Sequence, residues 1–307
     1  MEVIENLADV PPAPSGRALA VGTFDGVHLG HRRVIESALG WGRAHGAPVA
    51  VVTFDPHPLQ VLRPDDPPRL LASPSVKADL IRETGVDELV VIPFTEELSK
   101  LRAEQFCDDI LVGTLEARHV SVGANFRFGR DARGDSALLE GRPEFETAVV
   151  PLLEVDGEPV SSSRIRALLE EGDVVRAREL LGAPFQLEGR VVEGDARGRS
   201  LGMPTANLAP VEDVIVPAIG IYAGLALDHP AAISIGVRPT FESDGKLLVE
   251  AHLIDFEGDL YGQAVRIVFL ERLRDEIRFD SAEQLAEQMR RDIAQVREIT
   301  GRTAERS

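Results

Sequence analysis

The chain has little cysteine and little positive charge. Cys107 is the only cysteine among 307 residues, which excludes an internal disulfide framework and is typical of a protein in a reducing compartment. Lysine and arginine number 33 against 51 aspartates and glutamates, which gives a formal charge of −18. Nucleic acids bind basic surfaces, so this charge argues against a nucleic-acid partner. An anionic substrate would have to be bound by local positive groups.

Long apolar runs are also missing. No run is long enough to span a membrane, and the acidic N-terminal residues lack the basic and apolar regions of a signal peptide. We therefore expect a cytoplasmic protein without a membrane partner. The composition, 44% hydrophobic and 27% charged, is ordinary for a soluble globular protein, and the length favours two domains. Nothing in the sequence predicts an oligomeric state.

The first half is organised around residues 18–31, ALAVGTFDGVHLGH. Its first four residues are apolar, as in a buried strand, and a helical pattern begins near His31. His28 and His31 are three positions apart, so both rings can face one way, and Gly30 leaves room for a phosphate. The N-terminus of a helix suits a polyphosphate. Two surface histidines without a role are the alternative, whereas a zinc site lacks further cysteine or histidine ligands nearby.

Strands and helices alternate through this half. The expected strands are 48–54, 88–94, 118–123 and 147–153, and the expected helices are 76–84, 103–111 and 174–181. This alternation predicts an α/β fold with a doubly wound parallel sheet. Residues 1–17 are expected to form an irregular lead-in.

Two loops follow strands of this predicted sheet, at the ends where α/β proteins bind ligands. Asp55-Pro56-His57-Pro58 follows the first of them, and we interpret His57 as either a turn residue or a substrate contact. The other loop interleaves Phe126 and Phe128 with Asn125 and Arg127. We interpret it as facing adenine or flavin, with plain core packing of the two rings as the alternative.

Residues 161–166, SSSRIR, precede a helical run. Serines are common helix N-caps, and capping alone would explain them. Arg164 and Arg166, however, oppose the helix dipole in the first turn, so helix stability does not account for them. We interpret them as ligands for the distal phosphates of a triphosphate.

The pattern changes after Gly182-Ala183-Pro184, which ends a helix. Short strand-like runs follow at 186–192, 221–227, 231–237, 247–254 and 265–270. They predict a small antiparallel β-barrel, and a C-terminal amphipathic helix is expected at 281–298.

The second half has its own chemistry-bearing residues. The loop 194–207 combines glycines and arginines that suit a polyphosphate, and Thr205 and Asn207 supply oxygens that suit Mg²⁺. Strand alternation places Glu250 and His252 on one face, where a carboxylate could deprotonate an alcohol. A flexible surface turn and a solvent-facing glutamate are the alternatives.

Together these motifs resemble the bacterial bifunctional riboflavin kinase/FAD synthetase family over residues 15–300. The segments that carry the resemblance are GTFDGVHLGH (22–31), FDPHP (54–58), NFRFG (125–129), SSSRIR (161–166), GMPTAN (202–207), GIYA (220–223), GVRPTF (236–241), VEAHLIDF (249–256) and LRDE (273–276). The first and fourth also resemble phosphate-binding signatures of the nucleotidyltransferase superfamily. The chain departs from the common pattern at Asn125, where aspartate is frequent, and at Met203, where an aromatic residue is frequent. Val160 and Ser163 are milder departures, from isoleucine and threonine.

The resemblance implies two domains and two reactions. An FAD synthetase domain (15–183) would transfer AMP from ATP to FMN, and a riboflavin kinase domain (184–304) would make FMN from riboflavin and MgATP. Catalytic roles fall to His28, His31 and Glu250. The implied ATP contacts are Gly22, Thr23, Phe24, Asp25, Gly30, Asn125, Ser162, Ser163, Arg164, Arg166, Gly198, Gly202 and Pro204. The implied flavin contacts are Asp55, His57, Phe126, Arg127, Phe128 and Arg274, and Thr205 and Asn207 would arrange Mg²⁺.

Two other functions share some of these features. One is a nucleotidyltransferase with another acceptor, or a tRNA-charging synthetase, although the latter would need a Lys-Met-Ser-Lys-Ser loop and a basic surface. The other is a flavin sensor that keeps the fold without turnover, against which the retained His28, His31 and Glu250 argue.

Overall fold

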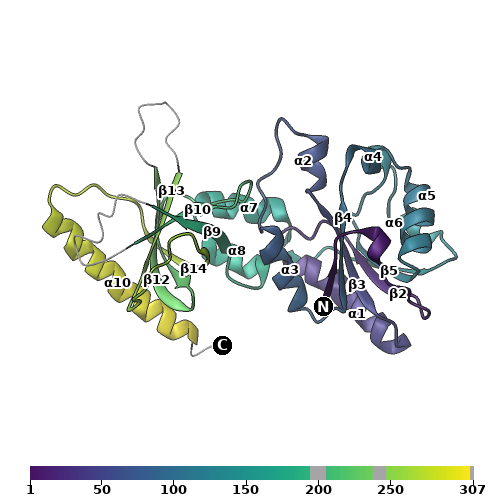
Figure 1. Ribbon diagram of the computed structural model, residues 1–307, viewed down its shortest axis with the longest axis horizontal. Helices are drawn as coiled ribbons and strands as arrows, with labels where there is room; N and C mark the ends of the chain where they lie inside the picture. Colours follow the sequence, from purple (N-terminus) through teal and green to yellow (C-terminus); the bar gives the residue numbers. More distant parts are fainter. Residues whose placement is uncertain (194–204, 238–246, 305–307) are drawn as a thin grey trace. The chain divides into compact units, whose positions relative to one another are not determined.

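The computed structural model describes residues 1–193, 205–237 and 247–304, and the chain divides into two compact units. The first comprises Met1–Pro68 and Pro74–Ser162, and the second comprises Arg69–Ser73 and Ser163–Ser307. Figure 1 shows a sheet with flanking helices in the first unit and strands with one long helix in the second. The domain boundary at residues 183/184 stays a prediction.

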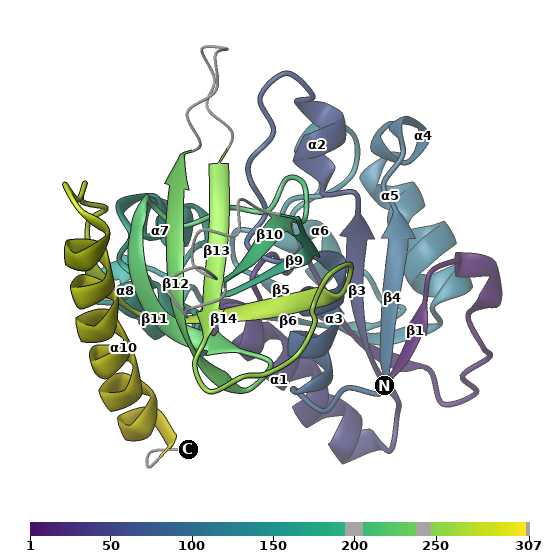
Figure 2. The ribbon, with the colours of Figure 1, turned by 60° about the vertical axis from the view of Figure 1, so that its left-hand side comes forward.

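Six parallel strands form the sheet of the first unit, in the order β1-β4-β3-β2-β5-β6. Their bounds, from β1 to β6, are Glu2–Ile4, Arg17–Val21, Val49–Asp55, Glu88–Pro93, Ala117–Gly123 and Glu146–Val150. Every neighbouring pair is parallel, which confirms the predicted sheet. β1 was not predicted, because three residues are too few to show a strand pattern. It lies within the expected lead-in and pairs with β4 at the sheet edge, as Figure 2 shows.

The connections of this unit are mainly helical. The helices are α1 Leu29–His45, α2 Pro58–Leu62, α3 Pro74–Arg82, α4 Glu96–Ser99, α5 Ala103–Gln105 and α6 Ser136–Glu140, with 3₁₀ turns η1 Leu7–Asp9 and η3 Arg130–Ala132. β7 Glu154–Val155 and β8 Glu158–Pro159 form a short antiparallel ribbon. The single helix predicted at 103–111 is instead α5 followed by a π-helix, η2 Phe106–Thr114. There the Leu115 N–H donates to the Ile110 carbonyl, a wider spacing that sequence periodicity does not reveal.

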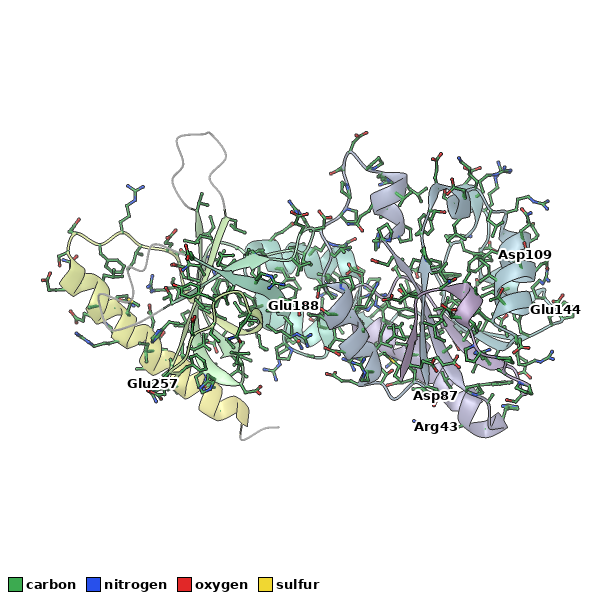
Figure 3. All side chains as sticks on the ribbon, in the orientation of Figure 1. Arg43, Asp87, Asp109, Glu144, Glu188 and Glu257 are labelled. Atoms are coloured by element: carbon green, nitrogen blue, oxygen red, sulfur yellow. The ribbon has the colours of Figure 1, made fainter. Side chains whose placement is uncertain are left out.

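Helices cover the sheet, and its central strands contain continuous apolar runs at 18–21 in β2 and 49–52 in β3. All five residues of β2 are buried, and only the last residue of β3 is exposed. Such continuous apolar runs are typical of parallel strands covered on both faces. At the start of β3 the Val49 N–H donates to Asp87 Oδ2 at 2.8 Å; Figure 3 labels this aspartate. This bond ties the start of β3 to the residue that precedes β4.

The second unit contains a closed antiparallel barrel in the order β10-β13-β12-β11-β14-β9. The strands β9 to β14 are Gln186–Val192, Ala206–Pro210, Gly220–Ala226, His229–Val237, Leu247–Leu253 and Ala264–Arg274. The predicted barrel is confirmed, with one correction. Ala206 and Asn207, expected in a loop, begin β10, whose alanines and proline favour strands weakly but which pairs with both β9 and β13.

Within the described part of the second unit the helices are α7 Ser162–Glu171, α8 Val174–Leu181 and α10 Ala282–Ala304. α10 corresponds to the helix predicted at 281–298 and runs alongside β11 and β12 (Figure 2). Its Val296 and Ile299 pack with Ala223 and Leu270 in an apolar cluster. Among the described residues, no helix is both long enough and apolar enough to cross a membrane.

Candidate functional site

The turn between β2 and α1 places two histidines at a helix N-terminus. Phe24 and Val27 in this turn have φ of 49° and 43°, the left-handed region, although both side chains are buried. Such strained residues cluster at ligand-binding sites, because the surrounding structure must hold them. His28 is the N-cap of α1, and its Nδ1 accepts a hydrogen bond from the His31 N–H at 3.2 Å. The helix therefore begins with a side chain that also faces the turn.

The two imidazoles are stacked on one another. Their ring centroids are 3.5 Å apart and their planes differ by 15°. A Cβ built on Gly30 would lie 3.2 Å from His28 Cε1, so this glycine makes room for the His28 ring. A phosphate contact at Gly30 stays a prediction. The Phe24 ring meets His31 edge-on at 5.3 Å and fixes the other side of the pair.

Both histidines are neutral at pH 7. Burial lowers the pKa of His28 to about 4. Burial, then the nearby His28 and Lys77, lower the pKa of His31 well below its usual value. Since His28 Nδ1 accepts a hydrogen bond, its proton is on Nε2, which can donate to a ligand. Within the described part of the chain, the buried Nδ1 of His31 has no hydrogen-bond partner.

Lys77 on α3 is a residue of this site that the sequence analysis missed. Its Nζ lies 3.5 Å from Thr53 Oγ1 and 3.5 Å from the Phe54 carbonyl oxygen, at the carboxyl end of β3. Its charge acts on His31, and Asp25 and Asp55 act on it. A single lysine in a helical pattern does not stand out in the sequence. Its place at the site depends on the packing of α3 beside the carboxyl end of β3.

The predicted ATP residues Gly22 to Asp25 are tied to their surroundings. Asp25 is buried, and its carbonyl oxygen accepts a hydrogen bond from Ser162 Oγ at 3.1 Å. The Thr23 carbonyl oxygen accepts from Thr53 Oγ1 at 2.9 Å. A Cβ on Gly22 would lie 3.3 Å from the Phe24 ring. The turn is thus fixed to β3 on one side and to the start of α7 on the other.

The loop after β3 has a structural reason for its histidine. His57 is the N-cap of α2: its Nδ1 accepts from the Leu59 N–H at 3.2 Å, and its own N–H donates to Gln60 Oε1 at 2.9 Å. Asp55, the last residue of β3, is exposed. The role of His57 as a turn and cap residue is thus present in the structure. A flavin contact from Asp55 or His57 stays a prediction.

The aromatic loop after β5 divides between core and surface. Phe128 is buried in the apolar cluster beside Phe106, and Phe126 stacks on it with centroids 5.4 Å apart. Asn125 and Arg127 are exposed, and Arg127 Nη1 is 2.9 Å from Asp135 Oδ2. Phe128 therefore packs in the core, which was the alternative interpretation for the two rings. A flavin or adenine contact from Phe126, Phe128, Arg127 or Asn125 stays a prediction.

The segment 161–166 lies where the two units meet in sequence. Ser162 begins α7 and belongs to the first unit, whereas Ser163, Arg164 and Arg166 belong to the second. Arg166 Nε donates to the Arg69 carbonyl oxygen within that second unit. The proposed phosphate contacts of the serine and the two arginines stay predictions.

The barrel carries a second candidate site, a cavity of about 410 Å³ between its outer face and α10. Strand pairing places one row of residues along its floor. Glu250 on β13 pairs with Asn207 on β10 and with Ser234 on β12. Ser234 pairs in turn with Ile221 on β11, and Ile221 with Arg274 on β14. Directly paired residues share a sheet face, so the row brings together three of the predicted kinase residues.

The strand alternation expected around Glu250 is present. Val249, Ala251 and Leu253 are buried inside the barrel, whereas Glu250 and His252 are partly exposed and line the cavity. Thr205 lines the same cavity. Asn207 is buried, and within the described residues its Oδ1 has no hydrogen-bond partner. Gly198, Gly202, Pro204 and Met203 lie outside the described residues.

An ion pair between Arg274 on β14 and the buried Asp292 belongs to the lining of the cavity. Arg274 Nε and Nη2 lie 3.1 Å and 2.7 Å from Oδ1 and Oδ2 of Asp292 on α10, which is 4% exposed. Gln288 Nε2 donates to the same carboxylate at 2.8 Å. Around them the wall is apolar and is made by Ile277, Phe279, Leu285, Met289 and Ile293. The cavity therefore has an apolar end and, at Glu250, a polar end.

Comparison with known proteins assigns the two units to one family. A family model described as FAD synthetase matches residues 10–164, and one described as riboflavin kinase matches residues 181–300. A bifunctional riboflavin kinase/FMN adenylyltransferase from Pseudomonas fluorescens is 36% identical over 313 residues, covering 100% of both chains. The chain belongs to this family. The Escherichia coli K12 relative is 35% identical over 99% of each chain, and the Bacillus subtilis relative is 37% identical over 89% of each.

Membership confirms the predicted function: the protein is a bifunctional riboflavin kinase and FMN adenylyltransferase of flavin cofactor synthesis. Riboflavin, FMN and ATP are therefore its substrates, and FAD is its final product. A solved structure described as a macrolide-efflux protein from Streptococcus pneumoniae superposes with a TM-score of 0.86 at 32% identity. It covers 96% of this chain and 98% of that one, so both units share the fold of that protein.

Proposed function

We propose that riboflavin is phosphorylated in the barrel cavity, with Glu250 as the general base. The support is the row of paired residues that joins Asn207 to Glu250 and Ser234, of which Glu250 and Ser234 line the cavity. The carboxylate takes the proton of the terminal ribityl hydroxyl, and the hydroxyl oxygen forms a bond to the γ-phosphorus of ATP. The bond from that phosphorus to the β-phosphate oxygen breaks, and ADP leaves.

The flavin ring would occupy the apolar end of the same cavity. Phe279 and Met289 line that end, beside the Arg274–Asp292 pair. A flat aromatic ligand is well matched by such a slot, in which a few polar groups fix its orientation. The ribityl chain then extends along the floor toward Glu250. The Arg274 side chain would lie beside the ring, as the family resemblance implies.

Thr205 and Asn207 are suited to hold Mg²⁺ with ATP. Amide and hydroxyl oxygens are ligands that Mg²⁺ accepts, and the buried Asn207 Oδ1 has no protein partner within the described residues. When bound, the cation would neutralise charge on the phosphates. The loop 198–204, whose glycines and Pro204 are the predicted ATP contacts of this half, lies outside the described residues.

Adenylyl transfer would take place at the stacked histidines of the first unit. The phosphate of FMN is already ionised, so this reaction needs alignment and charge stabilisation and no general base. The neutral rings of His28 and His31 can each donate one N–H to a phosphate oxygen. Support comes from their position at the N-terminus of α1, where backbone N–H groups also face an anion. Gly22 to Asp25, Gly30, Asn125, Ser162, Ser163, Arg164 and Arg166 are proposed as further ATP contacts.

The proposal also covers the cell compartment and the domain boundary. The cell compartment would be the cytoplasm, which is supported by the single cysteine and by the charge of the chain. The domain boundary would fall near residue 183, which is supported by the start of the kinase match at residue 181.

A pair of variants tests the assignment of the two sites. Glu250→Gln keeps the size of the side chain but cannot take a proton, so riboflavin phosphorylation should fall about 10²–10⁴-fold. His31→Ala is its matched control, because it should lose FAD synthesis and keep riboflavin phosphorylation. Riboflavin-to-FMN and FMN-to-FAD conversions are measured separately for each variant. Near wild-type phosphorylation by Glu250→Gln would remove Glu250 as the base, and equal loss of both activities would contradict separate sites.

A further inference from the structure

Lys77 reaches the histidine site from a helix that carries none of the family motifs described above. α3 lies beside the sheet, and Lys77 Nζ approaches Thr53 and Phe54 at the end of β3. Thr53 Oγ1 also donates to the Thr23 carbonyl oxygen, which is part of the turn that leads to His28. The ammonium group is therefore next to the turn that the two histidines close.

This charge has weak partners in the protein. Both hydrogen bonds of Lys77 are 3.5 Å long, the upper limit for such bonds. Within the described ranges no carboxylate oxygen lies within 4.0 Å of its Nζ, whereas the buried Arg17 lies 2.6 Å from Glu88. Burial lowers the pKa of Lys77, and the more distant Asp25 and Asp55 oppose that change. A partly buried ammonium with so little compensation is costly unless an anion binds to it.

We propose that the Lys77 ammonium binds the phosphate group of FMN during adenylyl transfer. The inference rests on the proposed function, in which the transfer takes place at His28 and His31. Lys77 contacts the Phe54 carbonyl, and the next residue is Asp55, which begins the loop proposed to face the flavin. The N-terminus of α1 is proposed for ATP, and its His31 is close enough to Lys77 for that charge to lower the pKa of the ring. Lys77 is thus near both the loop proposed for FMN and the helix end proposed for ATP.

The reaction gives such a cation a clear task. An oxygen of the FMN phosphate forms a bond to the α-phosphorus of ATP, the bond from that phosphorus to the β-phosphate oxygen breaks, and pyrophosphate leaves with the electron pair. No proton is transferred, so Lys77 stays protonated throughout. Two anions must approach to bonding distance, on a chain whose formal charge is −18. One ammonium beside the incoming phosphate reduces this repulsion far more than it would in bulk water.

A structural role is the alternative for Lys77. Its ammonium could serve only to hold the Phe54 carbonyl and the end of β3. In that case replacement would lower the stability of the first unit and leave the KM for FMN unchanged. Two comparisons distinguish these roles: a charged against an uncharged replacement of Lys77, and the KM for FMN against the KM for ATP.

The test compares Lys77→Met, which keeps a long side chain without charge, with Lys77→Arg, which keeps the charge. For Lys77→Met, kcat/KM for FMN in FAD synthesis should fall about 10²-fold, the scale for loss of one stabilising donor. Most of this should be a rise in the KM for FMN, and the KM for ATP should change little. Lys77→Arg should recover at least part of the loss, and riboflavin phosphorylation should be unchanged in both variants.

Folding is followed separately, through Trp41, the only tryptophan, which lies on α1 of the first unit. If Lys77→Met shifts its unfolding midpoint strongly, Lys77→Gln is compared with Lys77→Arg in the same assays. Wild-type kcat/KM for FMN in the uncharged variants, or a loss expressed only in the KM for ATP, would overturn the proposal. An active His31→Ala variant would instead contradict the proposed histidine site, so the two failures are distinguishable.

Discussion

The two proposed sites would use different polar groups to break the same kind of phosphoanhydride bond in ATP. The first unit offers two neutral histidines and the ammonium of Lys77, whereas the barrel offers the carboxylate of Glu250 with Asn207 beside it. The difference follows from the nucleophile. The phosphate of FMN is already an anion and needs charge compensation, but the hydroxyl of riboflavin is neutral and must lose a proton. The protonation state of the acceptor thus accounts for the residue types of each site.

The two folds also gather their residues in different ways. In the parallel sheet, polar residues come from the ends of β2 and β3 and from the neighbouring helices α1 and α3. In the barrel they come from the middle of strands and form one row across the hydrogen-bonded neighbours of β13. The first arrangement tolerates changes in loops, whereas the second depends on strand register. A one-residue slip of β13 would turn Glu250 into the barrel interior.

The largest effect that sharpens this comparison is expected from Asn207→Ala. Losing the amide oxygen opposite Glu250 should raise the Mg²⁺ concentration for half-maximal riboflavin phosphorylation by about 10- to 100-fold, the scale seen for groups around bound metals. FAD synthesis from added FMN should keep its Mg²⁺ dependence, because its residues lie in the other unit. Titrating Mg²⁺ in both assays gives the two values.

Ser234→Ala is the matched control, since Ser234 is the other direct neighbour of Glu250 in the row. It should change the Mg²⁺ requirement much less than Asn207→Ala does. An equal rise in both variants would mean that the row only positions Glu250. An unchanged requirement in Asn207→Ala would exclude the amide as a metal ligand.

Most of the fold could be read from the sequence, because both sheets follow clear patterns. The continuous apolar runs of β2 and β3 and the alternation of β13 carry strong signals. β1 and β10 were missed because they are short and gain their order from pairing with neighbours rather than from their own composition. The π-helix was missed because a shift of one hydrogen bond leaves the apolar pattern nearly unchanged.

Site residues could be predicted from the sequence where they belong to a motif. The spacing of His28 and His31 predicts that their rings face one way, and the two rings are stacked. The spacing of Glu250 and His252 predicts one strand face, and both line the barrel cavity. Lys77 and Asp292 were missed, since each is one charged residue in a helical pattern that is rich in charge. Their role depends on which helix packs at the sheet edge or the barrel wall. The stacking that requires Gly30 was also invisible, because it depends on the orientation of the His28 ring.

A smaller effect is expected at the apolar end of the barrel cavity. Asp292→Asn removes the negative charge of the carboxylate that accepts hydrogen bonds from Arg274 Nε and Nη2. Charge-assisted hydrogen bonds are worth about 1.5–3 kcal/mol, so the KM for riboflavin should rise roughly tenfold if Arg274 lies against the flavin ring. Steady-state kinetics of riboflavin phosphorylation measure this change, and FMN adenylylation should not respond.

Asp255→Asn is the control, because it removes an exposed carboxylate that pairs with a residue of the same helix. Asp255 pairs with Arg297 of α10 at 2.8 Å, but both side chains are more than half exposed. Exposed pairs are worth about 0–1 kcal/mol, so the KM for riboflavin should remain at its wild-type value. A similar rise in both variants would show that the position of α10, and not the buried pair, governs flavin binding.

The smallest effect concerns the stability of the histidine site at mildly acidic pH. The pKa of His28 is lowered to about 4 in the folded protein, from 6.5 in the unfolded chain. Above 6.5 both states are neutral and the group has no effect on stability. As the pH falls below 6.5 the unfolded chain binds a proton that the folded one excludes, so stability is lost down to the folded pKa. Between pH 7.5 and pH 6.0, His28 should account for about 1 kcal/mol of this loss.

His28→Asn isolates that share, because asparagine is a good helix N-cap but does not titrate in this range. Unfolding by denaturant is followed through Trp41 for the first unit and through Tyr222 and Tyr261, the only tyrosines, for the second. The Trp41 midpoint of the variant should fall less than that of the wild type between pH 7.5 and pH 6.0. Both tyrosine signals should report the same change in variant and wild type. Identical Trp41 shifts would mean that His28 binds a proton normally in the folded state. The histidine site would then not be neutral at mildly acidic pH, which would contradict the contrast with the carboxylate site of the barrel.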